Sequence, residues 1–140
     1  MKQLNKPTFF LDRSLGKELI AKALRDKNVN VEVHDSHFPP NAKDEDWLQE
    51  VGDRGWIVLT KDRRFHKRML EITAIANSRV QVFKLTAANL QGAEMAEIFV
   101  KSIKKIERVA MSNRAPLIAT VSRTGRVSMF MSASKLRKYK

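Results

Sequence analysis

The feature that most constrains the fold of this chain is the alternation of short apolar segments with amphipathic ones. Short apolar or strictly alternating runs predict β-strands, and apolar residues at helical spacing predict helices. The expected strands are residues 8–11, 29–34, 56–60 and 80–85. The expected helices are residues 14–27, 44–54, 65–76 and 90–111. This order predicts an α/β fold with a three-layer architecture, in which helices flank a parallel sheet through right-handed crossovers.

The C-terminal part departs from this alternation. Segments 117–121 and 126–131, separated by a turn at Gly125, predict a β-hairpin. A length of 140 residues fits one domain. We therefore expect a single domain over residues 1–132, with a core at about 8–112 and a hairpin at about 116–131. Residues 133–140 should form a mobile basic tail.

The composition limits the classes of partner and of chemistry that this chain can have. The chain has 27 Lys plus Arg against 15 Asp plus Glu, a net charge of +12. Residues 71–140 carry +9 of it and residues 1–70 carry +3. Such a field attracts polyanions, nucleic acid before an anionic membrane, although a basic surface can also serve only solubility. Cysteine is absent, which excludes disulfides, thiolate zinc sites and a cysteine nucleophile. Without a long apolar run, we expect a soluble cytoplasmic protein with no membrane partner.

Aspartates follow three of the expected strands. Asp12 comes after the first strand, Asp35 after the second and Asp62 after the third, while Asp44 and Asp46 begin the helix before the third strand. Because parallel strands end at one edge of a sheet, these carboxylates should gather there. Clustered carboxylates favour a hard cation such as Mg²⁺ or Mn²⁺, which also binds phosphate oxygens and can activate water. This pattern predicts a metal centre for phosphodiester hydrolysis.

A simpler interpretation stands beside the metal centre. Each aspartate could merely cap a helix, and other doubly wound domains gather acids at this edge without being nucleases. His34 and His37 should point to different faces of the strand end, which argues against a histidine pair on a metal. Basic residues surround Asp62 and could hold a polyanion: Lys61, Arg63, Arg64, Lys67 and Arg68.

Four stretches of the chain resemble the PIN-like proteins, and among these the short VapC-type toxins of prokaryotic toxin–antitoxin systems. The stretches are 9–16, 34–39, 44–48 and 55–62. The Thr60-Lys61-Asp62 triplet that closes a strand and the 18-residue spacing from Asp44 to Asp62 carry the resemblance most specifically. It covers roughly residues 8–100, with the hairpin as an extension.

The resemblance implies a metal-dependent ribonuclease on a Rossmann-like sheet, with Mg²⁺ or Mn²⁺ as cofactor. It implies catalytic and metal-ligating roles for Asp12, Asp44 and Asp62, with Asp35 or Asp46 in support. The residues expected to contact RNA phosphates are Arg13, Lys61, Arg63, Arg64 and Lys67. Related nucleases often carry another acid just after the triplet, where this chain has basic residues.

The partners that this resemblance suggests are an RNA substrate, a cognate antitoxin protein and a second copy in a homodimer. An inactive PIN-like module that binds RNA or regulates another protein is the alternative, because this chain lacks the further acid.

Overall fold

The computed structural model describes residues 6–61 and 69–140, and it confirms the alternation of strands and helices. The strands are β1 (Thr8–Leu11), β2 (Asn30–Val33), β3 (Ile57–Thr60), β4 (Gln81–Leu85), β5 (Leu117–Val121) and β6 (Val127–Met131). The α-helices are α1 (Leu19–Arg25), α2 (Asp44–Asp53), α3 (Met69–Ser78), α4 (Gly92–Ser112) and α5 (Ala133–Leu136). Short 3₁₀ helices are η2 (Arg13–Leu15), η3 (His34–Ser36) and η5 (Arg137–Tyr139).

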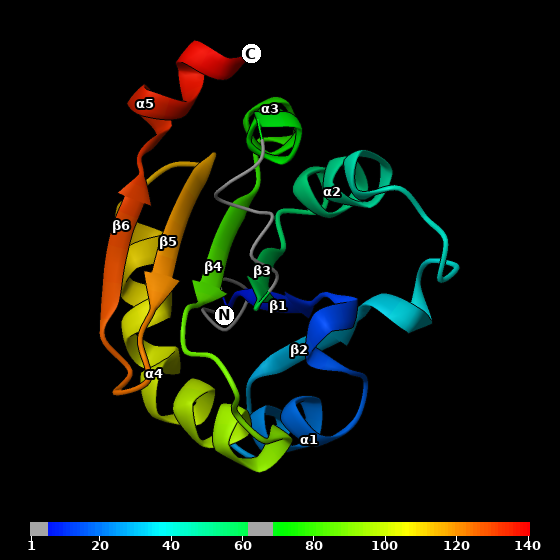
Figure 1. Cartoon of the computed structure of the whole chain (residues 1–140), viewed down its shortest axis with the longest axis vertical. Coiled ribbons are helices and arrows are strands. Elements are labelled where there is room, and N and C mark those ends of the chain that lie inside the picture. Colours follow the sequence, from blue (N-terminus) through cyan, green and yellow to red (C-terminus); the bar gives the residue numbers. More distant parts are fainter. Residues whose placement is uncertain (1–5, 62–68) are drawn as a thin grey trace.

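The strands form one sheet in the order β2-β1-β3-β4-β5-β6 (Figure 1). Strands β1 to β5 pair in parallel, and β6 pairs antiparallel with β5 to give the expected hairpin. The strand order reverses between β2 and β3, both of which pair with β1. In an open α/β sheet the ligand site lies outside the carboxyl ends of the strands at such a reversal, which here is where β1 ends.

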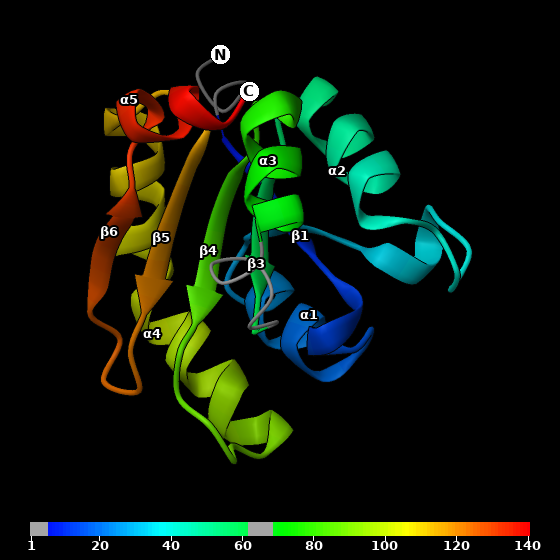
Figure 2. The same ribbon diagram turned by 45° about the horizontal axis from the view of Figure 1, so that its top comes forward.

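Helices cover both faces of the sheet (Figures 1 and 2). Phe9 and Leu11 of β1 pack with α1 and α4 on one face, whereas Phe10 packs with α2 and α3 on the other. All three side chains are at most 1% exposed, because a central strand buries both of its faces. The three-layer α/β architecture is therefore confirmed. None of the helices in the described ranges is both long and apolar enough to cross a bilayer.

The first helix begins later than the sequence predicts. The sequence predicts one helix over residues 14–27, but the chain first forms η2, and α1 begins at Leu19. Asp12 caps η2 by accepting the Ser14 N–H, and Gly16 then leaves the helical conformation with a φ of 75°. This left-handed φ favours glycine, so Gly16 separates the two helical segments.

The C-terminal residues are folded, which corrects the expectation of a mobile basic tail at 133–140. Ser132 caps α5 by accepting the Lys135 N–H, and η5 follows directly. Leu136 is fully buried in the core between the sheet and α3, and Tyr139 packs against the same core. Leu136 and Tyr139 are the large apolar residues of this otherwise basic segment, and they hold it beside α3 (Figure 2).

Candidate active site

Asp12 is a buried, hydrogen-bonded carboxylate at the carboxyl edge of the sheet. It follows β1, is 3% exposed, and its backbone N–H donates to the Leu59 carbonyl of β3 at 3.2 Å. Its Oδ1 accepts the Ser14 N–H at 2.9 Å and the Ser14 hydroxyl, and its Oδ2 accepts the Thr60 hydroxyl at 2.6 Å. Hydrogen bonds to a charged acceptor are strong, so this network fixes the orientation of the carboxylate.

The network around Asp12 extends to the Thr60-Lys61-Asp62 triplet. The hydroxyls of Ser14 and Thr60 lie 3.2 Å apart, and the Lys61 N–H donates to Ser14 Oγ at 3.1 Å. Thr60 thus ties the end of β3 to the end of β1. Asp62 itself lies outside the described residues, as do the expected RNA contacts Arg63, Arg64 and Lys67.

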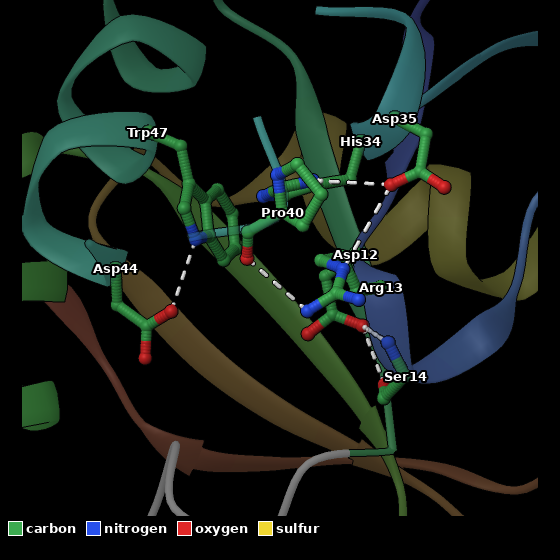
Figure 3. Close-up of polar contacts among 8 residues, drawn as sticks. All are labelled: Asp12, Arg13, Ser14, His34, Asp35, Pro40, Asp44 and Trp47. Atoms are coloured by element: carbon green, nitrogen blue, oxygen red, sulfur yellow. Dashed lines mark hydrogen bonds and ion pairs between the residues drawn. The ribbon is translucent and has the colours of Figure 1, made fainter. Parts of the chain in front are cut away.

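Asp12 borders a cavity of about 430 Å³ between the end of β1 and the helices α2 and α3 (Figure 3). Four acidic side chains from three parts of the chain line it: Asp12, the adjacent Asp44 and Glu45, and Glu71. Two cations, Arg13 and Lys43, line it as well. The structure therefore brings the expected residues Asp12, Asp44 and Arg13 to one cavity.

Asp44 begins α2 but does not cap it. The N-cap is Lys43, which makes no side-chain cap bond, and Asp44 Oδ1 instead accepts the indole N–H of Trp47 at 3.0 Å. The capping interpretation thus holds for Asp12 and fails for Asp44. Trp47 is 2% exposed, as expected for a core residue, and its indole orients the Asp44 carboxylate at the cavity wall.

The structure places the two supporting aspartates away from the cavity lining. Asp35 lies 3.8 Å from Arg13 Nε, and the Arg13 guanidinium also donates to the Pro40 carbonyl at 3.2 Å (Figure 3). Asp46 is exposed on α2, and Lys61 is exposed after β3. Metal roles for Asp35 and Asp46 stay predictions, and Asp35 is better placed to position Arg13.

Glu71 is a candidate that the sequence reasoning missed. It lies in the first turn of α3, lines the cavity, and its Oε1 is buried without a hydrogen-bond partner in the described part of the chain. The residues directly after Asp62 are basic. Nine positions after Asp62, however, a glutamate between Leu70 and Ile72 was a visible signal, because an acid among apolar residues in a helix is often half-buried.

His34 is a buried histidine in the cavity wall. It is 3% exposed, and its ring packs against Phe10, Phe38 and Trp47 at centroid distances of 6.1, 5.4 and 5.6 Å. Its Nδ1 lies 3.7 Å from Asp35 Oδ1 and has no hydrogen-bond partner in the described residues. Burial lowers the pKa of His34 below its ordinary value of 6.5, with Arg13 acting in the same direction and Asp35 opposing. His37 instead contacts Glu32 Oε1 at 2.7 Å.

The lowered pKa of His34 predicts a loss of stability in mild acid. The unfolded chain binds a proton at this histidine near pH 6.5, and the folded chain binds it only at lower pH. The stabilisation is therefore complete above pH 6.5 and decreases as the pH falls below it, by up to about 1.4 kcal/mol per pH unit. Urea unfolding at several pH values between 5.5 and 7.5 measures this slope. His34→Phe should have a shallower slope, and parallel slopes for the two proteins would contradict the prediction.

The cavity lining suits a hard divalent cation by its chemistry. Carboxylate oxygens are the ligands that Mg²⁺ and Mn²⁺ prefer, and the unpaired Glu71 Oε1 is a buried acceptor that a cation or its bound water could satisfy. Among residues 6–61 and 69–140, however, no three acidic or histidine side chains lie close enough to share one ion. Asp62, two positions after Thr60 in the sequence, lies outside these ranges, and its metal role stays a prediction.

The fold and this acidic cavity define a class of protein, and comparison with known proteins identifies its family. Residues 7–87 match the family described as the PIN like domain, and the chain belongs to that family. It is also 25% identical over 116 residues to a protein of Mycobacterium tuberculosis (strain ATCC 25618 / H37Rv) provisionally named ribonuclease VapC45. This likeness covers 80% of the chain and 83% of that protein. No solved structure matches the chain.

Proposed function

We propose that this protein is a metal-dependent endoribonuclease that hydrolyses phosphodiester bonds in RNA, and that it is the toxin of a toxin–antitoxin pair. The observation that carries the proposal is Asp12, a buried carboxylate fixed by Ser14 and Thr60 at the wall of an acid-lined cavity. Membership of the PIN-like family and the ribonuclease name of the M. tuberculosis relative support the same activity. The antitoxin, a homodimer and a cytoplasmic location belong to this proposal through the family.

The proposed roles combine the positions of the described residues with the family resemblance, which alone supports those of Asp62 and the basic residues after it. Asp12, Asp44 and Asp62 would hold Mg²⁺ or Mn²⁺, which supplies an activated water and stabilises charge on the leaving oxygen. Ser14 and Thr60 keep the Asp12 carboxylate in one orientation, so it does not have to reorganise when substrate binds. Arg13 at the cavity wall is held by the Pro40 carbonyl and Asp35, and its guanidinium is placed to pair with a phosphate. Lys61 and the basic residues after Asp62 would hold the flanking backbone.

The test compares wild type with Asp62→Asn on a panel of RNAs, in Mn²⁺ and in chelator. We expect wild type to cut at least one RNA in Mn²⁺, and we expect both the substitution and the chelator to stop the cutting. Cleavage that survives either change would exclude the proposed metal centre. A wild type that binds RNA with a steep salt dependence and cuts nothing would establish the alternative, an inactive RNA-binding module.

A further inference from the structure

A second cavity, of about 330 Å³, lies at the opposite edge of the sheet from Asp12. Arg79 precedes β4 and Arg114 precedes β5, so both lie at the amino ends of parallel strands, whereas Asp12 follows the carboxyl end of β1. Arg137 of η5 joins them from the folded C-terminal segment, beside α3 in Figure 1. We call this site the arginine cavity; its other lining residues are Ala115, Pro116, Ala133 and Lys140.

The charge of the arginine cavity is uncompensated. No acidic side chain lines it, and in the described part of the chain none of its three arginines forms an ion pair with a carboxylate. Cations placed around one hollow repel one another, so the arrangement favours an anion that enters it.

The three arginines come from separate elements that the core fixes in place. Leu136, fully buried, anchors the residue just before Arg137, and Tyr139 packs on the same core. Arg114 lies in the connection between α4 and the buried β5. The cavity is therefore a product of the tertiary fold, and it exists only because residues 133–139 are helical.

Arg79 occupies a backbone position that would suit glycine better. Its φ is 54°, in the left-handed region, which costs a non-glycine residue roughly 1–2 kcal/mol. Gly52 of α2 packs directly against this turn, with the position of its missing Cβ only 2.0 Å from the Ser78 carbonyl oxygen. The arginine at this strained position lines the arginine cavity.

We propose that the arginine cavity binds a phosphate group of the RNA, at a distance from the site of cleavage. This inference depends on the proposed function in one respect, the choice of RNA as the ligand. Guanidinium groups bind phosphate in a bidentate manner, and the residues from 71 onward carry +9 of the total charge. The two edges are separated by the length of a strand, about 17 Å for five residues, so an extended RNA can contact both edges at once. Such a contact would make long RNAs bind more tightly than short ones.

The test measures RNA binding in chelator, where cleavage does not occur, with a labelled single-stranded RNA of roughly 20 nucleotides. The cavity variant carries Arg79→Gln, Arg114→Gln and Arg137→Gln. The matched control carries Arg108→Gln, Arg123→Gln and Arg126→Gln, which removes the same charge from exposed arginines outside the cavity. We expect about 10-fold weaker binding for the cavity variant and less than about 3-fold for the control. The slope of log Kd against log salt should fall by about 0.7 for each phosphate that the cavity variant no longer binds.

Equal weakening of both triple variants would reduce the effect to general charge and overturn the proposal. The cavity would belong to a protein partner instead if two results were found together. An acidic polypeptide would bind wild type but not the cavity variant, and the cavity variant would bind RNA as tightly as wild type. If the triple variant does not fold, Arg137→Gln alone, on an exposed residue, should weaken RNA binding about 3-fold. Because binding is measured without metal, the two proposals can fail separately. If wild type cuts no RNA but the cavity variant still binds RNA more weakly than wild type, the ribonuclease proposal is refuted and this one is supported.

Discussion

Asp12→Asn should lower the rate of RNA cleavage in saturating Mn²⁺ by at least about 100-fold. Loss of a residue that only supports a metal ligand costs up to about 100-fold, and a ligand itself should cost at least as much. The substitution removes the negative charge that would bind the cation and keeps nearly the same shape. It also replaces one acceptor oxygen by an amide that donates, beside the hydroxyls of Ser14 and Thr60. We therefore expect a second effect, a decrease of about 1–3 kcal/mol in the free energy of unfolding, because hydrogen bonds to a buried charged acceptor are replaced by weaker neutral ones.

The matched control for Asp12→Asn is Asp53→Asn. Asp53 is an exposed residue at the end of α2, where its carboxylate accepts from Gln49 at 3.0 Å, and asparagine can accept the same bond. Cleavage by this variant should stay within about 2-fold of wild type, since surface changes away from a site have small effects. Initial cleavage rates and urea unfolding, measured on the same preparations, separate the two effects of Asp12→Asn. A folded Asp12→Asn protein with wild-type activity would remove Asp12 from the catalytic machinery.

The fold was largely predictable because its strands are short, apolar and buried on both faces. A central parallel strand such as residues 8–11 fits only the interior of a sheet that helices cover on both faces. The order of strands and helices then leaves few topologies. The C-terminal segment was mispredicted for a related reason. Its charge is visible in the sequence, whereas the burial of Leu136 depends on α3, a distant element with which it must pack.

Only part of the cavity lining was predictable from the sequence: Asp12 and Asp44 line the cavity as expected, whereas Asp35, which also follows a strand, does not. Asp12 follows a strand, and its position at the sheet edge comes directly from the topology. Asp46 and Glu71 belong to helices, and their orientation depends on how α2 and α3 rotate against the sheet. Asp46 is exposed on α2, whereas Glu71 on α3 lines the cavity. Periodicity indicates which face of a helix is apolar, and it does not show which polar residue borders the site.

The packing of α2 against the end of α3 should be the most sensitive point of the scaffold. Gly52 lies inside α2, and a Cβ there would come within 2.0 Å of the Ser78 carbonyl oxygen and 3.1 Å of its carbon. Both atoms belong to the backbone, so the contact can be relieved only if one helix moves. Gly52→Ala should therefore lower the free energy of unfolding by about 2–3 kcal/mol, even though alanine favours a helix interior over glycine by about 1 kcal/mol.

Gly92→Ala in the first turn of α4 is the control for this substitution. Its Cβ would meet only the tip of the Leu19 side chain, at 2.9 Å, and Leu19 is 54% exposed and free to move. We expect a change within about 0.5 kcal/mol there, measured by urea unfolding with tryptophan fluorescence. Because α2 also carries Asp44 and its C-terminal end supports Arg79, a displaced α2 should weaken both RNA cleavage and RNA binding. If Gly52→Ala were as stable as wild type, the helices could separate without cost, and the turn at Arg79 would not be held by this contact.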